Sequence, residues 1–265
     1  MSRSLLINLI KLIVVFIGVW LIFTIFPVIP GKSKHLISVE KENKLGDKIV
    51  NEVLRKDVSF DEINNTYTDS CINLITERLI KALGPSAYHY TFIIIKDSKI
   101  NAFTLPGGYI VIYSGLIDFI EKPEELAAVI AHEMGHMEKR HVVSRLVKNL
   151  GVSILLSGDK YVIGEIGKTA ATTAFDRRQE KEADQFSMAL LEKAEIEPRT
   201  LAVFFRRIKE EYRGFNKNIE IIMTHPHHDR RIKAALEYKP AKDFKSKPIE
   251  IDWERLKKVL RDVEL

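Results

Sequence analysis

The residues with the clearest chemical potential are two histidines and a glutamate in the pattern His132-Glu133-Met134-Gly135-His136. Apolar residues before this pattern predict that it lies inside a helix. Positions i and i+4 of a helix share one face, so both imidazoles could bind a single metal ion. Glu133 would project about 100° around the helix axis from His132, within reach of a water activated by that ion. The pattern predicts a zinc-dependent hydrolytic site, although a surface helix with two histidines remains an alternative at this point.

A catalytic zinc also requires a third protein ligand. The metzincin pattern would place a histidine at position 142 and a glycine at position 139, where this chain has Val142 and Lys139. A later segment offers Glu180 and Asp184, again at i and i+4. We expect Glu180 to bind the metal and Asp184 to accept a hydrogen bond from a liganding histidine. The alternative is a solvated, charged helix face, and Glu182 is interpreted in that way.

The elements that would position these groups follow from the residue pattern. Pro123 and the two glutamates after it begin a predicted helix that runs to about residue 141. Apolar stretches predict buried strands at 91–95 and 109–113, and Pro106-Gly107-Gly108 between them indicates the tight turn of a hairpin. Further helices are expected at 61–83, 177–193, 198–212 and 229–238.

The N-terminal segment is almost wholly apolar from residue 5 to residue 29. Its uninterrupted part, 12–29, is close to the ~20 residues that cross a bilayer core. Residues 26–30 offer no small-residue cleavage site, which favours an uncleaved membrane anchor over a cleaved signal peptide. The apolar region 149–174 contains Asp159 and other charged residues, so a surface-lying helix pair is expected there rather than a second span.

Four regions are therefore predicted. Residues 1–30 form one N-terminal transmembrane helix, and residues 31–60 form a linker and the start of the first helix. Residues 61–240 form a metallopeptidase domain, and residues 241–265 form a helical tail.

Composition narrows the classes of function. The formal net charge of the 265 residues is +5, and basic residues are interspersed with acidic ones, so nucleic acid is not an expected partner. Cys71 is the single cysteine, which excludes an intrachain disulfide and a cysteine-based zinc cluster. Its apolar surroundings favour a buried structural thiol over a nucleophile.

Short motifs extend over roughly residues 45–240 in a fixed order. They are Asn101-Ala102-Phe103, Pro106-Gly107-Gly108, Gly115-Leu116, His132-Glu133-x-x-His136, Arg140-His141, Arg178-x-Glu180-x-Glu182-Ala183-Asp184, Thr224-His225-Pro226 and Arg231-Ile232. With these motifs the chain resembles the zinc metallopeptidases that include the HtpX heat-shock protease, the CAAX prenyl protease and the mitochondrial Oma-type protease. One convincing span favours the single-anchor members of that family over the multi-span ones.

The resemblance implies a zincin-like α+β fold, mostly helical with a small sheet, that follows the N-terminal transmembrane helix. It implies one Zn²⁺ per chain, held by His132, His136 and Glu180. It also implies that an edge strand binds an extended peptide substrate. The residues expected to bind that substrate are Asn101, Ala102, Phe103, Gly107 and Gly108.

The late motif suggests two more catalytic residues, His225 and Arg231. His225 would stabilise the oxyanion or occupy the fourth metal position in a resting state, and a capping or buried histidine is the alternative. Arg231 would orient His225 or bind the tetrahedral intermediate. His227 and His228 match no motif and are expected to be exposed.

The expected function is a membrane-anchored metalloendopeptidase that cleaves unfolded or membrane-associated proteins in protein quality control. Its domain would lie on the non-cytoplasmic side, in the periplasm of a bacterium or at the mitochondrial inner membrane of a eukaryote. Expected partners are protein or peptide substrates and the membrane, and an oligomer remains possible. The alternative is a catalytically idle, zinc-binding scaffold or chaperone, against which the presence of Glu133 argues.

Overall fold

A small mixed sheet forms from the apolar stretches before the His-Glu-His pattern. The sheet consists of β1 (Thr91–Ile95), β2 (Ala102–Leu105) and β3 (Tyr109–Tyr113) in the order β1-β3-β2. β1 runs parallel to β3, and β2 runs antiparallel to it. The predicted hairpin therefore forms between β2 and β3, whereas the two strands expected from periodicity are parallel neighbours. Gly108, with φ 94°, is in the left-handed region at the turn, where a side chain would be strained.

The computed structural model describes residues 11–17, 37–54, 61–157, 159–213, 219–226 and 228–262. The chain divides into two units, Met1–Leu36 and Ile37–Leu265. The second unit contains the sheet and these elements in chain order: α2 (Val39–Ile49), the π-helical turn η2 (Val50–Leu54), α3 (Thr66–Leu83), β1, β2, β3, α4 (Ser114–Phe119), α5 (Pro123–Glu138), α6 (His141–Leu150), α7 (Val152–Leu155), α8 (Lys160–Thr172), α9 (Arg177–Lys193), α10 (Thr200–Arg213), α11 (Ile221–Thr224), α12 (His228–Glu237) and α13 (Trp253–Asp262). The expectation of a mostly helical fold with a small sheet is confirmed.

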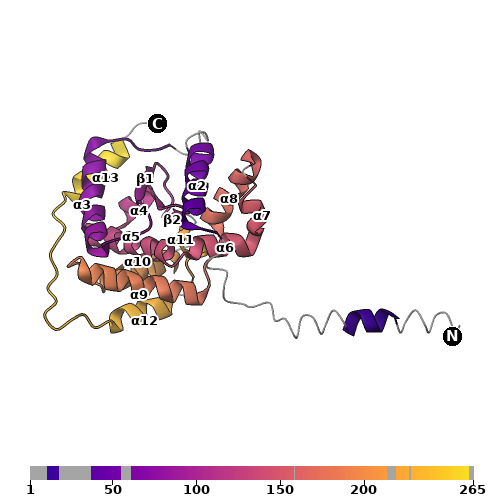
Figure 1. Ribbon diagram of the computed structural model, residues 1–265. Coiled ribbons are helices and arrows are strands. Elements are labelled where there is room, and N and C mark those ends of the chain that lie inside the picture. Colours follow the sequence, from indigo (N-terminus) through magenta and orange to yellow (C-terminus); the bar gives the residue numbers. More distant parts are fainter. Residues whose placement is uncertain are drawn as a thin grey trace. The chain divides into compact units, whose positions relative to one another are not determined.

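Both faces of the sheet are covered by helices (Figure 1). Alternate side chains along each strand point to opposite faces. Ala102 and Ile110 join α3, α5, α9 and α10 in one core, while Phe103 and Val111 join α2, α6 and α8 in a second core. Because the sheet is buried on both sides, its strands read as continuous apolar runs rather than as an alternating pattern.

Two parts of the chain fold differently from the sequence prediction. Residues 39–54, expected to lie in a linker, form α2 and η2, and the buried Leu45 and Ile49 of α2 belong to the second core. The predicted catalytic helix ends at Glu138, because Arg140 adopts a left-handed conformation with φ 55° and a new helix, α6, begins at His141.

The C-terminal helix packs against the rest of the second unit. Trp253, Leu256 and Leu260 of α13 are buried in the first core, and the Trp253 indole donates a hydrogen bond to the carbonyl of Ile120 at 3.1 Å. Within the expected helical tail 241–265, the helix is confined to Trp253–Asp262, residues 241–252 are not helical, and the helix is part of the core.

The predicted transmembrane helix lies largely outside the described residues. Of residues 1–30, the structure describes 11–17, which are helical and exposed. Within the described part of the chain, no helix combines the length and the apolar character needed to cross a bilayer.

Candidate metal centre

The His-Glu-His pattern lies on a helix that is buried almost throughout. Pro123 occupies the first turn of α5, where its missing N–H is tolerated, and Glu124 and Glu125 favour the positive end of the helix dipole. The side chains of His132, Glu133 and His136 are all buried. A buried helix with three polar groups on adjoining faces requires partners for them nearby.

The first partners come from α9, which packs closely against α5. Asp176 and Gln179 form a capping box that fixes where α9 begins. At the contact, a Cβ added to Gly135 would lie 3.0 Å from the Ala183 carbonyl oxygen and 3.1 Å from its Cα. The glycine inside the His-x-x-x-His spacing thus permits the close helix approach that brings Glu180 beside the two histidines.

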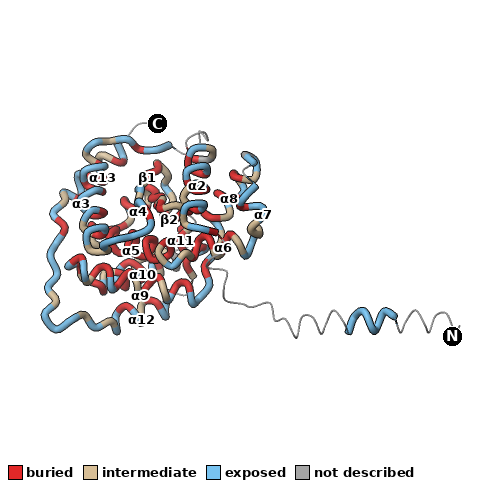
Figure 2. Tube along the Cα trace, in the orientation of Figure 1, coloured by how far each residue is buried: buried red, intermediate tan, exposed pale blue. Residues whose placement is uncertain are grey.

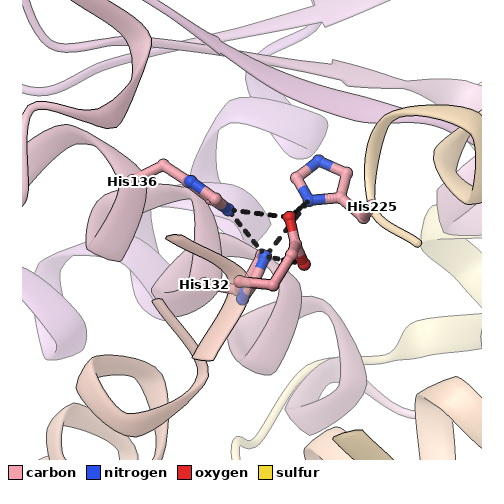
Figure 3. A group of neighbouring side chains, drawn as sticks. His132, His136 and His225 are labelled. Atoms are coloured by element: carbon pink, nitrogen blue, oxygen red, sulfur yellow. Dashed lines mark hydrogen bonds and ion pairs between the residues drawn. The ribbon is translucent and has the colours of Figure 1, made fainter. Parts of the chain in front are cut away.

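Four potential metal ligands converge at this contact. One donor atom from each of His132, His136, Glu180 and His225 lies within 4.8 Å of the other three. The Nε2 atoms of His132 and His136 are 3.0 Å apart, and His225 Nδ1 lies 3.2 Å from His132 Nε2 and 3.0 Å from Glu180 Oε1. Figure 3 shows the three imidazoles directed toward one another.

This spacing fits a tetrahedral ion. Zinc–ligand bonds of about 2.0–2.2 Å place neighbouring donor atoms of a tetrahedron roughly 3.3 Å apart. Glu180 Oε1 is 3.5 Å from His136 Nε2, and Glu180 Oε2 is 3.6 Å from His132 Nε2. Three imidazoles and one carboxylate are a donor set suited to zinc. The sequence assigned three of these ligands directly and considered the fourth, His225, as a resting-state ligand.

The protonation states also suit a metal. Burial lowers the pKa of His136 well below its ordinary value, which keeps the imidazole neutral and its lone pair available. Burial opposes the charge on Glu180, but Arg231 and His225 outweigh this effect and hold the pKa of the carboxyl well below its usual range. Asp184 behaves in the same way, and Arg231 is the main cause of its lowered pKa.

Asp184 and Arg231 form a buried pair behind the ligands. Asp184 Oδ1 lies 3.0 Å from Nδ1 of His132, as expected for a carboxylate that leaves Nε2 to the metal. Arg231 donates to both oxygens of Asp184, at 2.7 and 2.9 Å, and lies 2.5 Å from Glu180 Oε2. Arg231 also donates to the His225 carbonyl at 3.3 Å. These contacts favour an orienting role for Arg231 over direct contact with substrate.

Glu133 lies beside the potential ligands and is held by Thr104, a residue for which the sequence motifs predict no role. The hydroxyl of Thr104 on β2 donates to Glu133 Oε2 at 2.7 Å, with the Glu133 carbonyl also within reach at 3.1 Å. The other oxygen, Oε1, is buried 3.4 Å from His225 Nε2 and has no hydrogen-bond partner within the described residues. One carboxylate oxygen is thus fixed, and the other is left to face a reacting group.

His136 has two further neighbours, His141, for which a structural hydrogen bond is expected from the sequence, and Phe175, for which no role is expected. His141 Nδ1 lies 3.1 Å from His136 Nδ1, and its Nε2 lies 3.0 Å from Glu182 Oε2. The interpretation of Glu182 as merely solvated is therefore wrong, because its carboxylate lies within hydrogen-bond distance of a buried histidine. Phe175 stacks on His136 with ring centroids 3.7 Å apart. Local periodicity carries no signal for such contacts.

The expected substrate-binding residues divide into two groups. Asn101 and Phe103 line a cavity of about 450 Å³ that lies between the β2 segment and α8. Asn101 is buried, and its Oδ1 has no hydrogen-bond partner among the described atoms. Ala102 points into the opposite core, and Gly107 and Gly108 pack against the backbone of other segments, so these three do not line the cavity.

Comparisons with known proteins agree with this geometry. The model of peptidase family M48 matches residues 68–239, well over half of the chain. The chain is 25% identical over 229 residues to a beta-barrel assembly-enhancing protease of Yersinia pestis, covering 80% of this chain and 46% of that protein. It is 25% identical over 218 residues to the mitochondrial metalloendopeptidase OMA1 of Schizosaccharomyces pombe, covering 79% of this chain and 64% of the relative.

A third relative is the metalloprotease LoiP of Escherichia coli. It is 34% identical over 154 residues, which are 54% of this chain and 60% of LoiP. The chain spans less than half the length of the beta-barrel assembly-enhancing proteases that it matches.

Proposed function

Since the chain belongs to peptidase family M48, and is therefore a metallopeptidase of a zinc-dependent family, we propose that it is an endopeptidase with its centre at the α5–α9 contact. The observation that carries this proposal is the convergence of four ligand atoms within 4.8 Å of one another, with the carboxylate of Glu133 beside them. His132, His136 and Glu180 would hold one Zn²⁺, and His225 would be the fourth, exchangeable ligand.

A zinc ion there would supply Lewis-acid activation of water and of the scissile carbonyl. Glu133 would accept the proton of the attacking water through its free Oε1 and then deliver it to the leaving amine. Thr104 would hold the other oxygen, so that the carboxylate keeps one orientation during both transfers. His225, 3.4 Å from Glu133, is placed to donate to the developing oxyanion once it leaves the metal position.

The cavity beside β2 is the proposed site of the substrate. β2 is an edge strand of the sheet, and a peptide could add to it in extended form. The unpaired Oδ1 of Asn101 would then accept a hydrogen bond from a peptide N–H, since a buried acceptor without a partner is costly. Phe103 and Leu105 line the same cavity and favour apolar substrate side chains.

We further propose that the substrates are unfolded or membrane-associated proteins, cleaved during protein quality control. The relatives named as a beta-barrel assembly-enhancing protease and as a mitochondrial metalloendopeptidase support this class. The apolar run at residues 12–29 supports a membrane anchor, with the domain on the non-cytoplasmic side.

Casein cleavage by the purified full chain, with metal content measured in the same preparations, tests the catalytic proposal. Glu133→Gln keeps the size of the side chain and removes the base, so kcat should fall by about 10²–10⁴-fold while one zinc per chain remains bound. The control is Glu165→Gln on the exposed part of α8, which should cleave casein like the wild type.

Two outcomes would contradict the proposal. Cleavage at the wild-type rate by Glu133→Gln would exclude this residue as the base. A wild-type chain that binds one zinc and digests nothing would favour the idle scaffold or chaperone.

A further inference from the structure

The turn between α7 and α8 exposes an unusual cluster of large apolar side chains. Ile154, Leu156 and Tyr161 are 41%, 47% and 82% exposed, and they lie within eight consecutive residues. Elsewhere in the described part of the second unit, the large apolar side chains that are exposed lie six or more residues from one another: Leu74, Ile80, Val203, Met223 and Leu236. We call the three residues 154, 156 and 161 the α7–α8 tip.

Residues next to the tip are anchored in the second core and at the capped start of α8. Leu155 and Ile163, which alternate with the exposed residues, are buried in the second core. The Asp159 side chain accepts hydrogen bonds from the backbone N–H groups of Tyr161 and Val162 at 2.9 and 3.3 Å, which caps α8. The described backbone on either side of residue 158 is thus held from inside, while the three apolar side chains are exposed. Figure 2 shows α7 and the start of α8 as largely exposed at the flank of the unit.

The composition of the tip suits a lipid interface. Aliphatic side chains and a tyrosine, whose ring is apolar and whose hydroxyl remains hydrated, are the residue types that enter the headgroup boundary. The flanking helices add the exposed Lys148 and Lys168, whose long side chains can reach phosphate groups.

The short segment between the apolar run and Ile37 limits how far Ile37 can lie from a membrane anchor. Ile37 is buried in the same core as Leu155 and Ile163, and its carbonyl accepts a hydrogen bond from Arg140 at 2.6 Å. Seven residues, 30–36, separate this fixed point from the apolar run that ends at residue 29. Fully extended, eight residue steps span at most about 29 Å. An anchor at 12–29 would therefore hold Ile37 within about 29 Å of the end of the apolar run.

We propose that the α7–α8 tip inserts Ile154, Leu156 and Tyr161 into the interfacial layer of the membrane that holds the N-terminal segment. The inference rests on the membrane anchoring put forward above. α8 also forms one wall of the substrate cavity, through Gly164, Gly167 and Ala171. Contact with lipid at the start of α8 would therefore bring one wall of that cavity near the membrane, where membrane-associated substrates are concentrated.

The test uses the full chain in liposomes of phosphatidylcholine and phosphatidylglycerol. Single cysteines replace Ile154 or Tyr161 in a Cys71→Ala background and carry an environment-sensitive fluorophore. If that background does not fold, Cys71 can stay, because it is 4% exposed and protected from labelling. Val203→Cys on α10 is the matched control, since Val203 is 45% exposed.

Labels at the tip should shift to shorter emission wavelengths and lose most of their intensity when lipids with spin-labelled acyl chains are included. The Val203 label should do neither. A chain that floats with the liposomes but shows no lipid quenching at the tip would overturn the proposal while leaving the anchor intact. An emission shift that grows with the density of protein on the liposomes, without quenching by the spin-labelled lipids, would identify a second copy of the chain as the occupant. That result would also overturn the proposal.

Failure of the premise gives a different result. A chain that does not float with the liposomes would overturn both the anchor and the tip proposal. Casein cleavage by the same preparation would still report separately on the endopeptidase proposal.

Discussion

At the scale of single residues, Glu133, the proposed catalytic base, is held by a neighbour from the sheet. Thr104 fixes Oε2 of Glu133 through a 2.7 Å hydrogen bond, and no other described side chain holds this carboxylate by a hydrogen bond. A freely rotating carboxylate would spend less time facing the reacting water. If Glu133 is the base, Thr104 is a positioning residue that acts through it.

The prediction compares Thr104→Val with Thr104→Ser. A hydrogen bond to a charged group contributes about 1.5–3 kcal/mol, so valine should lower kcat roughly 10- to 100-fold with KM and zinc content unchanged. Serine keeps the hydroxyl and should restore most of the rate. Steady-state kinetics on a quenched-fluorescence peptide measure both, and equal rates for valine and wild type would refute the role.

A second prediction at this scale concerns the contact between His141 and Glu182. It lies behind His136, and groups that support a metal ligand in this way typically change metal affinity by 10- to 100-fold. Glu182→Ala should weaken zinc binding by that factor in competition with a chelator. Glu165→Ala, at an exposed position of α8, should leave the zinc affinity unchanged, and equal affinities for the two variants would contradict the prediction.

At the scale of elements, the site depends on how closely α5 and α9 approach. Because Gly135 has no side chain, the Ala183 backbone can approach to 3.0–3.1 Å from the position that a Cβ would take. This contact sets the distance between Glu180 and the two histidines of α5. The separation of the helices thus determines whether one ion can bind all three residues.

Gly135→Ala should therefore reduce both stability and zinc affinity. Overpacking at a close contact costs about 1–3 kcal/mol, which lowers Tm by several degrees in a domain of this size. Gly164→Ala is the matched control, because nothing lies within 4 Å of an added Cβ in that part of α8. The free energy of unfolding of this control should increase by up to about 1 kcal/mol, because alanine is favoured over glycine inside a helix. Calorimetry measures both, and a Tm for Gly135→Ala at or above the wild-type value would disprove the packing argument.

At the scale of the whole molecule, the proposed metal site joins parts that are distant in the chain. Its candidate ligands come from α5, from α9 and from the residue after α11, and Arg231 of α12 links them. An ion bound there stabilises the folded chain, since the unfolded chain does not hold these groups together.

Removal of the metal should consequently lower the melting temperature. At free zinc a thousandfold above Kd, the ion contributes about 4 kcal/mol to the free energy of unfolding. Chelator-treated protein should melt well below the zinc-loaded protein, and added zinc should restore the transition. The variant His136→Ala should show a much smaller difference in Tm between zinc-loaded and chelator-treated protein. A wild-type Tm that does not change with chelator would argue against a metal shared among these helices.

The sequence by itself determined the local features of this protein. The spacing of His132 and His136 places both on one helix face because helical periodicity is a local property. Helix α9 was predicted at the residues where it occurs, since Asp176 and the following charged and apolar residues carry its start signal and its periodicity. Glu180 and Asp184 followed from the same periodicity.

The tertiary structure alone decided which distant groups meet. Thr104, Phe175 and the His141–Glu182 pair became visible only when segments 29 to 41 residues apart came into contact. Residues 39–54 look polar along the chain, but burial of one face of α2 against the second core makes them helical. The spacing of Leu45 and Ile49 marks one apolar face of α2, but the partners that such a face meets depend on packing between elements.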